Sequence, residues 1–64
     1  MHSFEFGGLV YEWRVTQEDQ VQLWGTWTEG IERHTACLLL LQVEELRLLL
    51  ETGAKVLREI EEDR

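Results

Sequence analysis

Apolar and polar residues alternate along much of the first forty residues. From residue 9 to residue 16 the odd positions are apolar: Leu9, Tyr11, Trp13 and Val15. A period of two is typical of a β-strand that buries one face. The same reasoning predicts strands at about 3–6, 9–16, 20–28 and 31–41. The turns are expected at Gly7-Gly8, at residues 17–20 and at Glu29-Gly30, since glycine supplies the positive backbone angles of tight hairpins.

The last third of the chain has a longer period. Apolar or small residues recur at spacings of three and four, at Leu46, Leu49, Leu50, Gly53, Val56, Leu57 and Ile60. This spacing predicts an amphipathic helix at about 42–62 with one apolar stripe. Gln42 followed by Glu45 resembles a weak capping box at its start. We expect the helix to bury this stripe.

Gly53 leaves two interpretations open. Glycine in a helix interior costs about 1 kcal/mol relative to alanine, so the helix could break after Thr52. Alternatively, Gly53 lets the helix lie close to the sheet or to a second helix. The apolar spacing keeps its phase across Gly53, which favours the close approach.

The run from Cys37 to Leu41 is apolar at every position. In a strand, consecutive side chains point to opposite faces, so positions 37, 39 and 41 would share one face and Leu38 and Leu40 the other. One helix can cover only one face of a small sheet, and the other face then needs a partner chain. A longer helix with Thr35 as its N-cap is the alternative, since periodicity cannot assign a short apolar run.

Together these elements predict a single α+β domain over residues 1–64. It is an antiparallel β-meander of three to four strands followed by one C-terminal amphipathic helix. A chain of 64 residues has marginal stability alone and usually needs disulfides, metal or oligomerisation. Cys37 is the only cysteine, so no intrachain disulfide forms. We therefore expect a homodimer and, from the sparing use of cysteine, a cytoplasmic location.

The three tryptophans divide between two faces. Trp13 and Trp27 have the parity of the predicted core, whereas Trp24 has the opposite parity. Trp24 therefore points to a second apolar surface, and tryptophan is common at interface hot spots. The expected interface residues are Val10, Trp24, Leu38 and Leu40 on the sheet and Gly53 on the helix.

The charge balance bears on the partner. Thirteen acidic residues stand against six basic ones, giving a formal net charge of -7. Nucleic-acid binding normally needs a basic surface, so we expect a protein partner. No apolar run reaches the roughly 18 residues of a membrane span, and the first residues lack the pattern of a signal peptide.

No motif for catalysis stands in the sequence. His34 and Cys37 would point to opposite faces of a strand, and two ligands are fewer than a zinc site needs. Gly7-Gly8 alone is a turn and not a phosphate loop. We therefore expect a non-enzymatic protein with no catalytic residues, no cofactor and no metal.

The join Leu39-Leu40-Leu41-Gln42-Val43-Glu44-Glu45-Leu46, with antiparallel strands before it and a helix after it, resembles the positive-cofactor-four family of single-strand DNA-binding coactivators. The resemblance covers about residues 9–60 as a pattern. It implies a homodimer with its helices packed together and curved sheets that face DNA.

Two functional hypotheses follow. The first is a homodimeric interaction protein that regulates or inhibits another protein. Small acidic proteins of phages and mobile elements, including inhibitors of host defence enzymes, have this general make-up. The alternative is a single-stranded nucleic-acid binder that stacks bases on Trp24 or Trp13.

Overall fold

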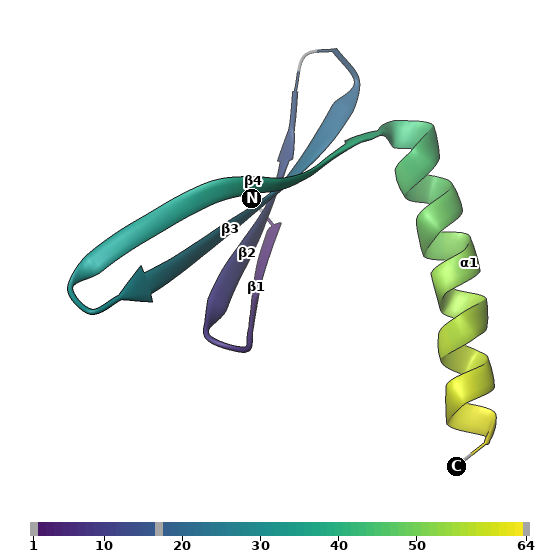
Figure 1. Ribbon diagram of the computed structural model, residues 1–64. Coiled ribbons are helices and arrows are strands. Elements are labelled where there is room, and N and C mark those ends of the chain that lie inside the picture. The colour runs from purple at the N-terminus through teal and green to yellow at the C-terminus, as the bar shows by residue number, and fades with distance from the viewer. Residues whose placement is uncertain (1, 17, 64) are drawn as a thin grey trace.

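The computed structural model describes residues 2–16 and 18–63 (Figure 1). Its elements follow the chain as strands β1 (His2–Phe6), β2 (Leu9–Val15), β3 (Gln20–Glu29) and β4 (Glu32–Gln42) and helix α1 (Val43–Glu62). The strands form one antiparallel sheet in the order β1-β2-β3-β4. The predicted α+β class and the meander are confirmed, and the run at 37–41 is strand. Gln17, which was predicted to lie in a turn, is outside the described residues, as are Met1 and Arg64.

Glycine makes two of the three hairpins. Gly7 and Gly8 have φ values of 62° and 82°, which only glycine adopts readily, and they join β1 to β2. Gly30 has a φ of 64° and joins β3 to β4 with Ile31 beside it. Between β2 and β3, the backbone N–H of Thr16 donates to the carbonyl of Gln20 at 2.9 Å.

The strand register assigns every side chain to one of two faces, since directly paired residues of antiparallel strands share a face. We call the first the apolar face. It carries His2, Phe4, Phe6, Leu9, Tyr11, Trp13, Val15, Val21, Leu23, Gly25, Trp27, His34, Ala36, Leu39 and Leu41, with Glu29 and Glu32 at the end of the β3–β4 hairpin. We call the second the mixed face. It carries Ser3, Glu5, Val10, Glu12, Arg14, Gln20, Gln22, Trp24, Thr26, Thr28, Arg33, Thr35, Cys37, Leu40 and Gln42. Trp24 thus lies opposite to Trp13 and Trp27, as its parity predicts.

A register shift in β4 changes the faces of two residues. Leu23 pairs with Leu39, but the next residue, Trp24, pairs with Cys37, so Leu38 is the extra residue of a β-bulge. A Cβ built on Gly25 would lie 2.7 Å from Leu38 Cδ1, which places Leu38 over Gly25 on the apolar face. The strict alternation predicted for this run is therefore wrong. Cys37 joins the mixed face, and Leu38 does not share a face with Leu40.

The chain buries little apolar surface. Among the described residues, the buried apolar side chains are Val21, 6% exposed, and Leu41, 8% exposed. These two residues pair with each other across β3 and β4. They lie close to the point where the sheet ends and the helix begins, so the core is confined to that corner of the molecule.

Helix α1 does not cover the sheet. It follows β4 with no intervening residue, because β4 ends at Gln42 and α1 begins at Val43. Helices that return onto a strand usually need a loop of about 2–6 residues. Figure 1 shows α1 extending away from the end of β4, and among the described strands only β3 and β4 approach it closely. The expectation that the helix buries its stripe is therefore wrong for a single chain.

The helix itself is regular. It runs through Gly53 without a break, so of the two interpretations of Gly53 the interruption after Thr52 is excluded. At its start, Glu45 Oε1 accepts a hydrogen bond from the backbone N–H of Gln42 at 3.4 Å. Glu44 and Glu45 lie in the first turn, where the helix dipole favours negative charge.

Candidate functional site

The apolar stripe of α1 is largely uncovered. No residue of the helix is buried. Leu49, Leu50, Val56, Leu57 and Ile60 are each about half exposed or more. We call these five residues, together with Leu46 and Gly53, the helix stripe. Large exposed apolar surfaces in proteins are typical of sites that contact another protein, a membrane or a ligand.

The helix stripe continues into the apolar face of the sheet. An open hollow of about 290 Å³ lies between them, and its lining is almost wholly apolar. It is lined by His2, Trp13, Val15, Val21, Leu46 and Leu50. Val15 is 78% exposed at its rim. Strand and helix thus present one continuous concave surface, with Val21 at its base.

Size and surface area both show that this surface is unusual for a monomer. The Cα radius of gyration is 14.6 Å, whereas a compact chain of this length has about 11 Å. The accessible surface is 5662 Å², whereas a folded monomer of 7.6 kDa has about 4,300 Å². The excess follows from a single-layer sheet and a helix that does not pack over it.

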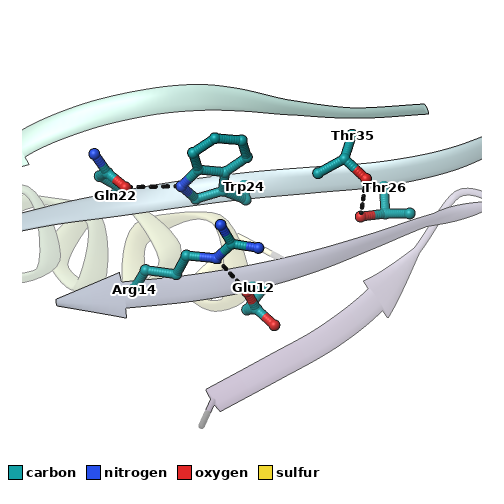
Figure 2. Close-up of polar contacts among 6 residues, drawn as sticks. All are labelled: Glu12, Arg14, Gln22, Trp24, Thr26 and Thr35. Atoms are coloured by element: carbon teal, nitrogen blue, oxygen red, sulfur yellow. Dashed lines mark hydrogen bonds and ion pairs between the residues drawn. The ribbon is translucent and has the colours of Figure 1, made fainter.

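On the mixed face, Trp24 is held by two polar neighbours (Figure 2). Its indole Nε1–H donates to Gln22 Oε1 at 2.9 Å. The guanidinium carbon of Arg14 lies 4.4 Å from the centre of the Trp24 ring, a cation–π contact. Glu12 in turn accepts from Arg14 Nε. These contacts fix the ring against the sheet and leave Trp24 only partly exposed.

The other predicted interface residues divide between surfaces. Val10 and Leu40 lie with Trp24 on the mixed face, exposed by 44% and 57%. Leu38 lies on the apolar face because of the bulge. Gly53 lies on the helix stripe, and a Cβ added there would meet no atom within 4 Å. The structure thus brings three of the five residues to one face and places two elsewhere.

A second hollow borders the end of β4. It has a volume of about 530 Å³ and a mixed polar and apolar lining of Gln20, Leu40, Leu41, Gln42, Glu45 and Leu48. Leu48 is off the helix stripe and faces this second hollow. The two hollows therefore lie on either side of the strand-to-helix junction.

In the β3–β4 hairpin, one imidazole lies near two carboxylates. The ring of His34 stacks on Trp27 with the ring centres 5.6 Å apart. Its Nε2 lies 3.6 Å from carboxylate oxygens of Glu29 and Glu32, which is too far for hydrogen bonds. His34 and Cys37 lie on opposite faces, as predicted, so they cannot chelate one ion together.

The described residues show no arrangement for metal binding. No group of three or more His, Cys, Asp or Glu side chains within residues 2–16 and 18–63 is placed to hold a metal ion. Within that part of the chain, no helix combines the length and the apolar character needed to cross a membrane. The expected lack of catalytic residues and cofactors stays a prediction.

Sequence reasoning missed the hollow and the Arg14–Trp24 contact. Arg14 and Trp24 have the same parity on neighbouring strands, so a register could have placed them on one face. The register needed the length of the turn between β2 and β3, which the sequence left open.

Compared with known proteins, the chain matches no family model, no curated protein and no solved structure. The resemblance to the positive-cofactor-four family therefore stays a prediction. The surfaces described above are the basis for a functional proposal.

Proposed function

We propose that this protein is a non-enzymatic, homodimeric interaction module that regulates or inhibits a partner protein. The observation that carries the proposal is the mismatch between exposed and buried apolar side chains. Of the apolar side chains in residues 2–16 and 18–63, two are buried, whereas the helix stripe and much of the apolar face are open. A domain with so small a core gains most of its stability from association.

The mixed face suits the regulated partner. It combines two aliphatic side chains, Val10 and Leu40, with a tryptophan pinned by Arg14. Tryptophan and arginine are enriched at interface hot spots, where a rigid side chain loses little entropy on binding. This face remains available when the apolar face and the helix stripe associate with another copy.

Surface charge favours protein over nucleic acid. The mixed face carries Arg14 and Arg33 but also Glu5 and Glu12, and Glu12 pairs with Arg14. A phosphate backbone is bound through an excess of basic side chains. Here that excess is missing, although the Trp24 ring would offer a stacking surface.

The test of homodimerisation is light scattering on the purified protein across a range of concentrations. The proposal expects a mass of two chains at micromolar concentration. A single-chain mass over the whole range would contradict it.

The test of the partner surface compares two baits in an affinity capture. Wild-type protein should retain a binding protein that the Trp24→Ala variant loses, while light scattering shows both baits to be dimers. Ile31→Ala in the β3–β4 turn, where the side chain is fully exposed, is the matched control and should keep any captured protein. Fluorescence titration with labelled single-stranded oligonucleotides at two salt concentrations separates the alternative, because tight and salt-dependent binding would favour it.

A further inference from the structure

We infer that helix α1 of a second copy lies in the angle between the apolar face and α1 of the first, so that two chains exchange helices. The inference rests on the proposed homodimer and names the surfaces that make it. Each helix then covers the partner's sheet instead of its own. The mixed faces, with Trp24, remain on the outside.

The strand-to-helix junction supplies the first argument. Gln42 is extended, with φ -77° and ψ 153°, and the next residue is already helical. Without loop residues, only the first turns of α1, at Leu46 and Leu50, lie beside the apolar face of its own sheet, and the rest of the helix extends away from it. The apolar face therefore has to be covered by another chain, and the helix stripe has to find another sheet.

Shape supplies the second argument. A helix of 20 residues is about 30 Å long, and a strand of 10 residues such as β3 spans about 33 Å. The two surfaces therefore match in length. Gly53 leaves the middle of the helix stripe without a side chain, and no atom of its own chain lies within 4 Å of a Cβ placed there. A bare position of this kind allows the backbones of two helices to approach closely.

Surface area supplies the third argument. One chain exposes 5662 Å², and a compact folded particle of twice its mass has about 7,100 Å². Reaching that value would bury about 4,200 Å² in total. Obligate homodimers bury about 2,000–5,000 Å², so a second copy of this chain is an occupant of the right size.

Charge sets the direction of the helices. The last turns of α1 carry Glu59, Glu61, Glu62 and Asp63 with Arg58, whereas the first turns carry Glu44, Glu45 and Arg47. Parallel helices would bring the two acidic ends together. Antiparallel helices keep them apart and oppose the two helix dipoles favourably. Leu57 and Ile60 of one copy then reach the hollow beside Trp13 and Val15 of the other.

Edge pairing is the competing arrangement. Strand β4 is a free edge, and edge strands can pair with another chain. However, the bulge at Leu38 interrupts the apolar half of β4, and bulges protect edges from such pairing. Edge pairing would also leave the helix stripe uncovered.

Charge substitutions on the two surfaces test the exchange. Leu57→Glu on the helix stripe and Val15→Glu on the apolar face should each weaken the homodimer by at least about 30-fold in dissociation constant, measured by analytical ultracentrifugation. The matched controls, Leu48→Glu on the same helix and Val10→Glu on the same strand, should stay dimeric. Leu48 and Val10 are exposed by 53% and 44% but lie off the proposed contact.

An isotope-filtered NMR experiment on the wild-type protein avoids any loss of folding in the variants. Labelled and unlabelled copies are mixed, and cross-chain contacts are read between methyl groups of Leu57 or Ile60 and the ring of Trp13. Such contacts support the exchange. If the wild-type protein is a dimer without these contacts, or if the Val15→Glu variant remains dimeric, the exchange is overturned and the proposal of a homodimer stands. A wild-type monomer overturns the homodimer itself.

Discussion

The sheet and the helix of this protein reach their structures by different means. The sheet is a continuous ladder in which each strand pairs with the next, and cross-strand contacts such as the stacked Phe4 and Tyr11 rings, 4.8 Å apart, support it within one chain. The helix has its own backbone hydrogen bonds and its N-terminal Glu45 contact, but it lacks tertiary cover. Helical stability in proteins comes mostly from packing of the apolar face. The comparison teaches that the contacts that hold the sheet together lie within one chain, whereas most of the helix stripe finds no contact there.

The largest effect is expected from Leu49→Ala. If the second copy covers the helix stripe, this change removes buried methyl groups and should lower the free energy of unfolding of the dimer by about 2–5 kcal/mol. The measurement is urea unfolding followed by circular dichroism at a fixed protein concentration, because dimer stability depends on concentration.

The neighbouring variant Leu48→Ala is the control for that experiment. Leu48 is 53% exposed and Leu49 is 51% exposed, but only Leu49 belongs to the helix stripe. Leu48→Ala should cost less than about 1 kcal/mol, as is usual for surface positions. Equal losses for the two variants would mean that the stripe is not the buried side of the helix.

Trp24→Ala tests whether the mixed face binds a partner protein. It should weaken binding of a partner protein by about 2 kcal/mol or more if Trp24 is a hot spot, and leave the mass of the dimer unchanged. With Trp13 and Trp27 changed to Phe, the emission of Trp24 reports on this face alone. An emission maximum that moves on dilution together with dimer dissociation would instead place Trp24 in the dimer contact.

Gly8→Ala tests how far the sheet is stable by itself. Gly8 has a φ of 82°, and a side chain in this left-handed region costs about 1–2 kcal/mol. Thermal unfolding should show this loss in the strand signal.

Gly53→Ala is the contrasting change, because Gly53 is helical and open. It should stabilise the helix by about 1 kcal/mol through its higher helix propensity. In the proposed dimer, the added methyl group crowds the helix of the second copy, and this crowding opposes the gain.

Glu45→Ala is expected to have the smallest effect. It removes the acceptor for the Gln42 backbone N–H and a negative charge from the first turn of α1, at a cost of about 0.5–1 kcal/mol. The loss should appear in the helical signal at 222 nm during thermal unfolding. Glu51→Ala, in the middle of the helix, controls for the general effect of removing a carboxylate and should cost less.

The fold was predictable from the sequence because two periods separate cleanly. Alternation at residues 9–15 and the glycine pair at 7 and 8 specify the first hairpin, and the three- and four-residue spacing after Gln42 specifies the helix. The bulge at Leu38 was not predictable. Within a run of four leucines, a shift of one residue replaces one leucine by another, so the pattern of polar and apolar positions does not reveal the bulge.

The placement of the helix was also missed. The predicted strand ended at residue 41 and the predicted helix began at 42, which left no loop for the helix to turn back onto the sheet, and the segment from Leu41 to Leu46 contains no glycine, proline, serine or asparagine. That absence was the available signal, since those residues make most turns. The candidate surfaces likewise divide into one that the sequence predicts and one that it does not. The stripe was readable from spacing, whereas the hollow beside Trp13 and Val15 depends on the direction in which the helix leaves the strand.

The direct junction between β4 and α1 has a consequence for the lifetime of the protein in a cell. In the proposed dimer, a chain without a second copy keeps an uncovered helix that opens at little cost in free energy, and segments that open readily are the ones that proteases cut. Unpaired chains would then be degraded faster than paired ones. The amount of dimer would rise more steeply than the rate of synthesis, so that a low level of expression produces little dimer and a modest increase produces much more.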